Sequence, residues 1–235
     1  SSAASDVYKR QAETLAVRLN EFKRRRLTNV YYGPTYSSDI IKSKLDNTGV
    51  SYSSPTELPK IVAEALAKDK IVAIFRGALE FGPRALGHRS ILANPLNPKM
   101  KDIINARVKF REPWRPFCPS ILEEDRSKYF NPADVAPFMI VAYWVENEWT
   151  EKIRSVVHVD NSIRPQTVNK NIEPFYWQCI DEFRRITGEG IVLNTSFNVR
   201  GQPIIENPQD ALGCFFSTGL DAMALGDFWL EKSRS

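Results

Sequence analysis

The sequence is poor in the residues that build metal centres and disulfide frameworks. Its 235 residues include only two histidines and three cysteines. Cys118, Cys179 and Cys214 lie far apart and lack the spacing of metal ligands. We therefore expect buried thiols in a reducing compartment rather than disulfides or a zinc site. A histidine-rich transition-metal site is not expected either.

Long apolar segments and common nucleotide signatures are also missing. No apolar run approaches the roughly 18 residues that span a bilayer, and no secretory signal pattern is present. We therefore expect a cytoplasmic protein without a membrane partner. The sequence contains no Walker-type loop, no nucleophile elbow and no dinucleotide fingerprint. If ATP binds, another arrangement of residues must hold it.

The charge balance argues against a nucleic-acid partner. The net charge is +4, which is low for a domain that binds DNA or RNA. The one basic run, Lys23–Arg26, is interpreted as a solvated helix end, where cations complement the helix dipole. A contact with a phosphate backbone is the alternative.

The first residues look foreign to the rest of the chain. The stretch Asp6-Val7-Tyr8-Lys9-Arg10-Gln11 reads like a translated sequencing-library adapter. We therefore hypothesise that residues 1–11 are a non-native scar and that the native chain extends further upstream. The apolar residues Leu15, Leu19 and Phe22 then recur at helical spacing.

Helical periodicity and end signals predict several helices. The expected helices run from Ser37 through Leu45, from Leu58 to Leu66 with Thr56 as cap, from Asn97-Pro98 to about Arg107, from Pro174 to Gly188, and from Asn207-Pro208 to Gly219.

Short apolar runs between them predict strands. The expected strands are Val30–Tyr32, Ile71–Phe75, Ser90–Leu92, Phe138–Val145 as a central strand, Ile191–Leu193 and Asp221–Leu230. Helices and strands alternate without repeats. This order predicts one α/β or α+β domain, with a single twisted open sheet and flanking helices.

The segment Phe81–Ser90 predicts an anion-binding loop. Two glycines and a proline follow a buried strand directly. Arg84 and Arg89 can converge from such a loop, because guanidinium groups bind phosphate and carboxylate with paired hydrogen bonds. Exposed backbone N–H groups beside glycine would add donors. A plain turn with two surface arginines is the alternative.

A second basic segment, Val108–Phe117, also predicts anion binding. If the chain is extended there, Lys109 and Arg111 project from one face, with Arg115 close by. Trp114 and Phe117 are expected in the core, because aromatic residues are usually buried. A wall against a purine ring is the alternative for both.

Two further segments carry polar groups at strand ends. Thr195, Ser196 and Asn198 present hydroxyl and amide groups suited to phosphate oxygens or a cation. An ordinary turn with side-chain caps is the alternative. His158 and Asp160 share one side of an extended segment, so a metal pair is conceivable. A Mg²⁺ ion held by phosphates is easier to defend.

Taken in order, these motifs resemble the C-terminal region of the carbamoyltransferase family, which includes the tobramycin, cephamycin and nodulation-factor O-carbamoyltransferases. The resemblance extends from about Asn29 to Leu230. It rests on Glu80–Gly87, Arg89–Leu92, Arg111-Glu112, Arg115–Phe117, His158–Asp160 and Leu193–Asn198.

The resemblance implies a fold and a reaction. That region of the family is similar to the YrdC-type domain, which forms an acyl-adenylate from ATP. Its Lys-x-Arg and Thr-Ser-x-Asn pairs imply that ATP, with Mg²⁺, is bound by Lys109, Arg111, Thr195, Ser196 and Asn198. Lys109 and Arg111 would also be catalytic. Carbamoyl phosphate would be bound by Arg84, Arg89, Arg115 and His158. The implied reaction converts carbamoyl phosphate and ATP into carbamoyl-adenylate.

Five positions in three segments depart from the family pattern. Asn161-Ser162-Ile163 replaces the usual Gly-Thr-Ala, Cys118 replaces Ala, and Gln202 replaces Glu. The first change can alter the loop, because Asn adopts a left-handed backbone less freely than Gly.

The resemblance also implies a missing partner. Family members carry an N-terminal actin-like domain that transfers the carbamoyl group to an acceptor hydroxyl. We expect residues 12–28 to be a remnant of that domain or a linker, and residues 29–235 to be the activating domain. The alternatives are an RNA-binding domain, a threonylcarbamoyl-adenylate-forming enzyme and a catalytically silent interaction domain.

Overall fold

The computed structural model describes Leu15, Arg18 and residues 27–232. The chain divides between Val30 and Tyr31, and the elements below belong to the part from Tyr31 onward. The interpretations of residues 1–11 and of the basic run Lys23–Arg26 fall outside the described residues. In the segment where Leu15, Leu19 and Phe22 recur at helical spacing, only Leu15 and Arg18 are described, and both are helical.

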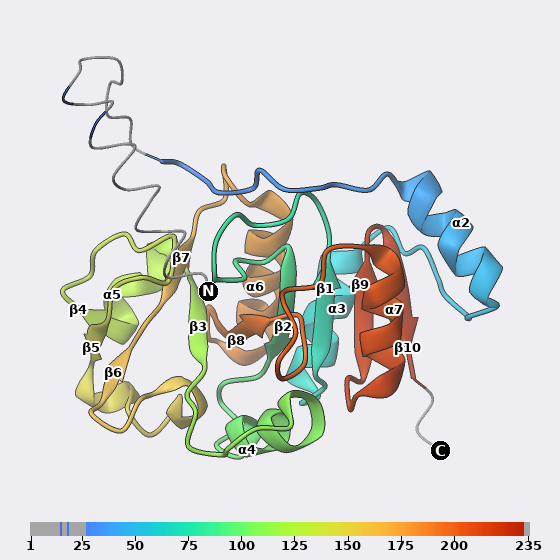
Figure 1. Ribbon diagram of the computed structural model, residues 1–235. Coiled ribbons are helices and arrows are strands. Elements are labelled where there is room, and N and C mark those ends of the chain that lie inside the picture. Colours follow the sequence, from blue (N-terminus) through green and yellow to red (C-terminus); the bar gives the residue numbers. More distant parts are fainter. Residues whose placement is uncertain (1–14, 16–17, 19–26, 233–235) are drawn as a thin grey trace. The chain divides into compact units, whose positions relative to one another are not determined.

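A seven-stranded mixed sheet forms the centre of the fold (Figure 1). Its order is β10-β9-β1-β2-β8-β3-β7. The pairs β9–β1 and β3–β7 are parallel, and the other neighbours are antiparallel. The strands are β1 (Val72–Phe75), β2 (Arg89–Ala93), β3 (Cys118–Leu122), β7 (Gln166–Val168), β8 (Ile191–Ser196), β9 (Ala222–Leu225) and β10 (Phe228–Glu231).

A second, smaller antiparallel sheet has the order β4-β5-β6. Its strands are β4 (Phe130–Asn131), β5 (Tyr143–Val145) and β6 (Ser162–Ile163). The expectation of a single sheet with a central strand over Phe138–Val145 is therefore wrong. Apolar composition misled that prediction, because Ile140 and Val141 lie exposed in the loop before β5.

From Tyr31 onward, the described residues form the following α-helices: α2 (Ser38–Thr48), α3 (Leu58–Ala67), α4 (Met100–Ile104), α5 (Arg126–Tyr129), α6 (Pro174–Thr187) and α7 (Pro208–Ser217). The ends of α2, α6 and α7 confirm the predictions from sequence. Ser37 accepts a hydrogen bond from the Ile40 amide, and Asn207 accepts one from the Asp210 amide. Gly188 ends α6 in the left-handed conformation that favours glycine.

Three of the predictions for individual helices and strands are wrong. Helix α3 is preceded by Glu57 and has no side-chain cap, so Thr56 does not cap it. Residues Val30–Tyr32 form no strand. The segment expected as one strand over Asp221–Leu230 is a hairpin, because Gly226 turns the chain with φ of 60°.

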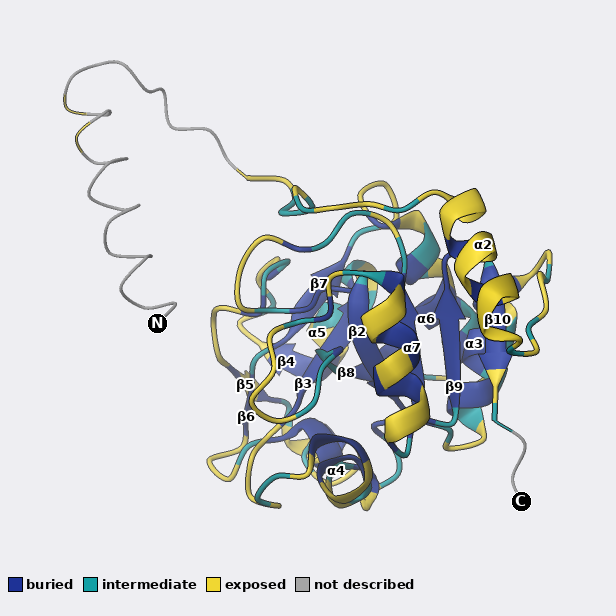
Figure 2. Ribbon diagram, turned by 45° about the vertical axis from the view of Figure 1, so that its right-hand side comes forward, coloured by how far each residue is buried: buried dark blue, intermediate teal, exposed yellow. Residues whose placement is uncertain are grey.

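Helices cover both faces of the large sheet (Figures 1 and 2). Alternate residues of each strand face opposite sides. One side packs Val72 and Val192 with the residues of α3 and α6. The other packs Ala73 and Leu193 with α2, α4, α7 and the small sheet. The predicted class, an α/β domain with a twisted sheet and flanking helices, is confirmed.

Figure 2 shows that the outward sides of α2 and α7 are exposed, while their inward sides are buried. Within the described part of the chain, no helix is both long and apolar enough to cross a membrane.

Candidate active site

A π-helical turn places Lys109. Helix α4 does not stop at Ile104 but continues into a π-helical turn over Asn105–Lys109. Phe110 then adopts a left-handed conformation with φ of 47°. The prediction that Lys109 and Arg111 lie on an extended segment is therefore wrong. The chain reverses between them, so the Lys109 side chain enters the core.

Asn105 holds this turn together. Its backbone carbonyl accepts hydrogen bonds from the amides of Phe110 and Arg111. Its side-chain oxygen accepts a hydrogen bond of 2.7 Å from Arg111 Nε. Its side-chain amide donates to the carbonyls of Pro113 and Arg115. The geometry of the Lys-x-Arg motif thus depends on a residue that the motif itself does not contain.

Lys109 joins the two motifs that are distant in sequence. Its Nζ donates to the carbonyl of Ser196, to the carbonyl of Asn198 at 3.0 Å and to Asn198 Oδ1 at 2.8 Å. Ser196 Oγ donates to the same Asn198 Oδ1 at 2.8 Å. These contacts bridge 87 and 89 positions of sequence. The structure therefore brings Lys109, Ser196 and Asn198 into one cluster.

The surroundings of Lys109 lower the pKa of its ammonium group. The residue is only 4% exposed. Burial lowers its pKa to about 7, and the neighbouring charge of Arg111 acts in the same direction. The three oxygen acceptors around Nζ suit an ammonium group. A phosphate anion placed nearby would raise this pKa again, so the site is prepared for a negatively charged ligand.

Arg111 lies beside this cluster, on an aromatic support. Its guanidinium group lies 4.6 Å from the centre of the Phe117 ring, and Phe117 is buried as predicted. Burial lowers the pKa of Arg111, and the charge of Arg115 lowers it further. The prediction that Trp114 belongs to the core is wrong, because 71% of its surface is exposed.

The two loops of the cluster are also linked at the surface. Glu112 forms ion pairs with Arg200 at 3.3 Å and with Arg115 at 3.9 Å. All three side chains are exposed, so each pair contributes little to stability. Arg115 therefore lies at the rim of the site, with its charge partly compensated.

Thr195 and Ser196 face opposite sides of the sheet. They are successive residues of β8 and pair with Ile91 and Ser90 of β2. Thr195 shares its side with Leu193, and Ser196 shares its side with Asn194. The two hydroxyl groups of the Thr-Ser-x-Asn motif therefore cannot act on one ligand atom from the same direction.

Cys118 connects the Lys109 cluster with a second group of cations. Arg164 Nη2 lies 3.2 Å from Cys118 Sγ. The Cys118 thiol lies close enough to Arg84 and Arg111 to favour the charged form of both. Burial lowers the pKa of Arg84, and the charge of Arg164 lowers it further. Arg164 thus contacts the thiol directly, and Arg84 and Arg111 interact with it electrostatically.

Arg164 is a site residue that the sequence interpretation missed. It follows His158 and Asp160 closely in sequence, where we predict a role for His158 but none for Arg164. The signal that could have identified it is its spacing from Gln166. Residues two positions apart in extended chain share a face, and Gln166 begins the buried strand β7.

His158 lies at the edge of the Arg164 group. Burial lowers its pKa, and the charge of Arg164 lowers it too, against the effect of Asp160. His158 Nδ1 lies 3.1 Å from Ser162 Oγ. His158 Nε2 and Arg164 Nε are buried without a hydrogen-bond partner among the described residues. Two such atoms near each other indicate a place for an anionic or polar ligand.

Asp160 has a structural role in the same turn. It accepts hydrogen bonds from the Ser162 amide at 3.0 Å and from Ser162 Oγ at 2.7 Å. Asn161 adopts the left-handed conformation with φ of 61°, so the replacement of Gly by Asn keeps that backbone conformation available. Among the described residues, no group of three His, Cys, Asp or Glu side chains could hold a metal ion.

The loop that carries Arg84 is closed by a carboxylate. Glu80 Oε1 accepts hydrogen bonds from the amides of Leu86 at 2.8 Å, His88 at 2.8 Å and Arg89 at 3.2 Å. The Gly87 amide donates to Ser90 Oγ. The expectation of free backbone donors in this loop is therefore wrong for these four amides. These four amides are not available to a ligand, and Arg84 is the remaining arginine of this loop that can contact one.

Arg89 is buried and supports the fold. Its residue is fully buried, and its guanidinium group lies 3.6 Å from the centre of the Phe75 ring. Its Nη1 donates to the carbonyls of Arg76, Gly77 and His88. Burial lowers its pKa to about 10. These contacts remove Arg89 from the expected anion ligands, so it does not converge with Arg84.

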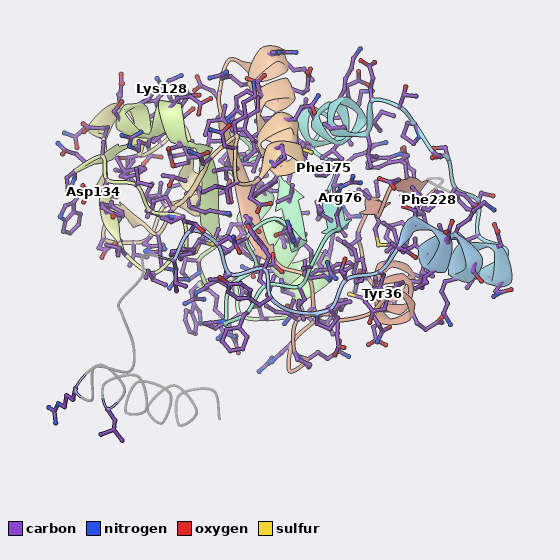
Figure 3. The ribbon with its side chains drawn as sticks, turned by 90° about the horizontal axis from the view of Figure 1, so that it is seen from above. Tyr36, Arg76, Lys128, Asp134, Phe175 and Phe228 are labelled. Carbon is purple, nitrogen blue, oxygen red and sulfur yellow. The ribbon has the colours of Figure 1, made fainter. Side chains whose placement is uncertain are left out.

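Two clefts lie on the described surface. One of about 720 Å³ is lined by Val199, Gln202 and Cys214, and so borders the Lys109 cluster. The other, of about 490 Å³, is lined by Tyr36, Arg76 and Phe175 (Figure 3). In the second cleft the charges are paired within the protein, as Arg76 with Asp227 and His88 with Glu173. The charged residues that line the first cleft are Glu206 and Asp210, and none of Lys109, Arg111 and Arg164 lines it.

Fold and site together define a class: an α/β domain whose mixed sheet is flanked by helices and whose buried Lys109 contacts the end of strand β8. Comparison with known families gives a more specific result. Residues 63–232 match the family described as carbamoyltransferase C-terminus. The chain belongs to this family.

Individual relatives agree with that assignment. An uncharacterized protein of Methanocaldococcus jannaschii, MJ1058, is 41% identical over 208 residues, covering 86% of this chain and 34% of the relative. Nodulation protein NolNO of Sinorhizobium fredii is 40% identical over 215 residues, covering 89% of this chain and 32% of the relative. The chain thus spans about a third of the length of these relatives.

A solved structure supports the fold. Full-length HypF, crystallised in a phosphate- and nucleotide-bound form, aligns with a TM-score of 0.54 and 22% identity. The alignment covers 73% of this chain and 25% of HypF. At this identity the likeness concerns the fold.

Proposed function

We propose that this chain is the activating domain of an O-carbamoyltransferase and forms carbamoyl-adenylate from carbamoyl phosphate and ATP. In the proposed reaction, carbamoyl phosphate is first hydrolysed to carbamate and phosphate. A carbamate oxygen then attacks the α-phosphorus of ATP, and pyrophosphate leaves. Membership in the carbamoyltransferase C-terminal family supports the transfer of a carbamoyl group.

The observation that carries the proposal is the Lys109 cluster. Two motifs far apart in sequence meet through the contacts of Lys109 with Ser196 and Asn198. The proposed step brings two anions together, so its barrier depends on fixed cations more than on an acid–base pair. We assign to Lys109 and Arg111 the neutralisation of the nucleotide phosphates. Lys109 would act through its charge, because its three donors already bind oxygens of Ser196 and Asn198.

The carbamoyl phosphate end is assigned to the group around Cys118. Arg84, Arg164 and His158 lie there, and two of their nitrogen atoms are buried without partners among the described residues. Arg115 lies at the rim, where it can add long-range attraction to an incoming anion. Arg89 is left out of this set, because main-chain carbonyls occupy its donors.

Mg²⁺ is proposed to come with ATP. Mg²⁺ is usually bound by one or two oxygen ligands of the protein together with substrate phosphates and water. The Ser196 hydroxyl is an oxygen ligand of that kind at the end of β8, whereas Thr195 faces the other side of the sheet. When bound, the ion would neutralise phosphate charge, and Lys109 would do the same from the protein side.

Transfer to an acceptor hydroxyl is proposed to take place in an actin-like domain outside this chain, as the resemblance implies. The relatives are about three times as long as the matched part, which leaves room for such a domain. The acceptor is bound there and not by the residues described above.

The proposal is tested by carbamoyl-phosphate-dependent exchange of radiolabelled pyrophosphate into ATP. The chain should catalyse exchange, and Lys109→Ala should abolish it. Lys44→Ala is the matched control, because Lys44 is exposed on α2, away from the site. Exchange that persists undiminished in Lys109→Ala would refute the site assignment. The absence of carbamoyl-phosphate-dependent exchange in the unaltered chain would refute the reaction.

One observation favours RNA binding as a second candidate. Phe110 and Trp114 are 52% and 71% exposed, and they alternate with Arg111 and Arg115. Exposed aromatic and basic residues together suit unpaired bases. This reading predicts binding of single-stranded RNA that weakens steeply with salt and is lost in Trp114→Ala. Carbamoyl-phosphate-dependent exchange would then be absent.

A further inference from the structure

Three buried polar side chains connect the strands that carry the site. Ser120 of β3, Gln166 of β7 and Asn194 of β8 are at most 2% exposed. The three strands are neighbours in the order β8-β3-β7. Buried polar groups are costly unless they are hydrogen-bonded, so this cluster has a specific reason to exist.

The three side chains bind one another. Ser120 Oγ donates to Gln166 Oε1 at 2.8 Å. Asn194 Nδ2 lies 3.0 Å from Ser120 Oγ and 3.2 Å from Gln166 Oε1. The contacts fix the side-chain rotamers on three adjacent strands. This cluster of Ser120, Gln166 and Asn194 is called the amide cluster below.

The amide cluster also binds the loop that carries Arg84. Gln166 Nε2 donates to the Leu86 carbonyl at 2.8 Å, and Asn194 Nδ2 lies 3.2 Å from the Ala85 carbonyl. Both carbonyls follow Arg84 directly in sequence. These two amides, together with the Tyr31 hydroxyl that donates to the same Leu86 carbonyl, hold the backbone that follows Arg84 against the sheet.

Each member of the cluster lies two residues from a residue of the proposed site. Gln166 follows Arg164, Ser120 follows Cys118, and Asn194 precedes Ser196. Residues two positions apart in extended chain share one face of a sheet. The amide cluster thus lies on the same face of the sheet as Arg164, Cys118 and Ser196, one step further along each strand.

We propose that Gln166 is a positioning residue that sets the spacing between Arg84 and Arg164 for the anion of carbamoyl phosphate. It is the one member that links both groups, through its own strand to Arg164 and through Nε2 to the Arg84 loop. Guanidinium groups bind an anion well only when their donors are aimed at the same place. This inference rests on the proposed function.

The test compares three variants in the pyrophosphate exchange assay. Gln166→Met keeps the volume and removes both hydrogen-bonding groups. Gln166→Glu keeps an acceptor for Ser120 and Asn194 but removes the donor to the Leu86 carbonyl. Ser120→Ala keeps the Gln166–Leu86 hydrogen bond. Gln178→Met, at an exposed position of α6, is the control.

Gln166→Met and Gln166→Glu should both raise the KM for carbamoyl phosphate by about three- to tenfold, the range expected for one lost hydrogen bond. The KM for ATP should change by less than about twofold, because the Lys109 cluster does not contact Gln166. The control should leave both KM values within that same margin. Ser120→Ala, which removes one support of Gln166, should raise the KM for carbamoyl phosphate by less than the two Gln166 variants do. A purely structural role would instead move kcat, both KM values and the melting temperature together.

The inference is overturned if Gln166→Glu leaves the KM for carbamoyl phosphate unchanged, or raises both KM values equally. Binding of inorganic phosphate, measured by calorimetry, separates this failure from failure of the proposed function. If the unaltered chain shows no exchange but Gln166→Met still weakens phosphate binding, the reaction is wrong and the positioning role stands. If Gln166→Met does not fold, Gln166→Glu alone decides.

Discussion

Proton uptake by Lys109 gives a strong test of the site. Burial lowers the pKa of Lys109 to about 7 in the free protein. The phosphates of ATP favour the ammonium form, so binding should raise this pKa toward its ordinary value of about 10.4. At pH 8, about a tenth of the free protein carries the charge, so binding should take up about 0.9 proton per ATP.

The sign of the pH dependence follows from the same shift. The pKa is higher in the bound state than in the free state. Affinity should therefore be full below pH 7 and fall as pH rises through the free-state pKa, by about tenfold per pH unit until the bound-state pKa is reached. Two neighbouring groups titrate on either side of the free-state pKa of Lys109. Burial lowers the pKa of His158 below its ordinary value and raises the pKa of Cys214.

Isothermal titration calorimetry at pH 8 in two buffers of different ionisation enthalpy measures the proton uptake. The observed enthalpy should change with buffer by the amount expected for about 0.9 proton. In Lys109→Met, which cannot take up a proton there, the difference between buffers should vanish. Equal enthalpies in both buffers for the unaltered chain would refute the reasoning, and so would a difference that survives in Lys109→Met.

Three further predictions concern stability, each measured by chemical or thermal denaturation. Phe110→Gly should be more stable than Phe110→Ala by about 1 kcal/mol, because the left-handed backbone at this position disfavours any Cβ; equal stability would show that the backbone is not strained. Gly87→Ala should destabilise the fold by about 2 kcal/mol or more, because its φ is 115° and a Cβ would lie 2.4 Å from Tyr176 Cδ1; a tolerated substitution would contradict the packing of the Arg84 loop. Relative to Lys109→Met, the unaltered chain should lose about 1.4 kcal/mol of stability per pH unit as pH falls from 10 to 7, because the folded-state pKa lies below the unfolded one; a pH-independent difference would contradict the burial of a titrating amine.

Local signals predicted the elements that depend on neighbours in sequence. The helix from Pro174 to Gly188 and the cap at Asn207 were read from residues within a few positions of each helix end. The same kind of signal failed for α3. We predict Thr56 as its cap, but no side chain caps this helix. Cap identity depends on side-chain geometry, which composition does not specify.

Residues in contact across the fold could not be predicted from local pattern. From the sequence, Lys109 and Arg111 can lie on an extended segment. In the structure a π-helical turn precedes Arg111, and the contacts of Asn105 with Pro113 and Arg115 stabilise it. Arg89 reads as a second anion ligand beside Arg84, yet carbonyls from two other segments surround it. A guanidinium group looks the same in sequence whether it binds a substrate or the protein's own backbone.

The carboxylate of Glu80 has a consequence for how this site distinguishes its ligands. Three amides that a phosphate-binding loop would offer to its ligand are already occupied by an anion that belongs to the protein. The loop is therefore in its folded shape before any substrate arrives, and a substrate cannot compete for those amides without expelling Glu80. Recognition at this end is left to guanidinium groups, whose planar geometry distinguishes the shape of an anion as well as its charge. The Glu80 carboxylate thus fixes the backbone of the loop that carries Arg84.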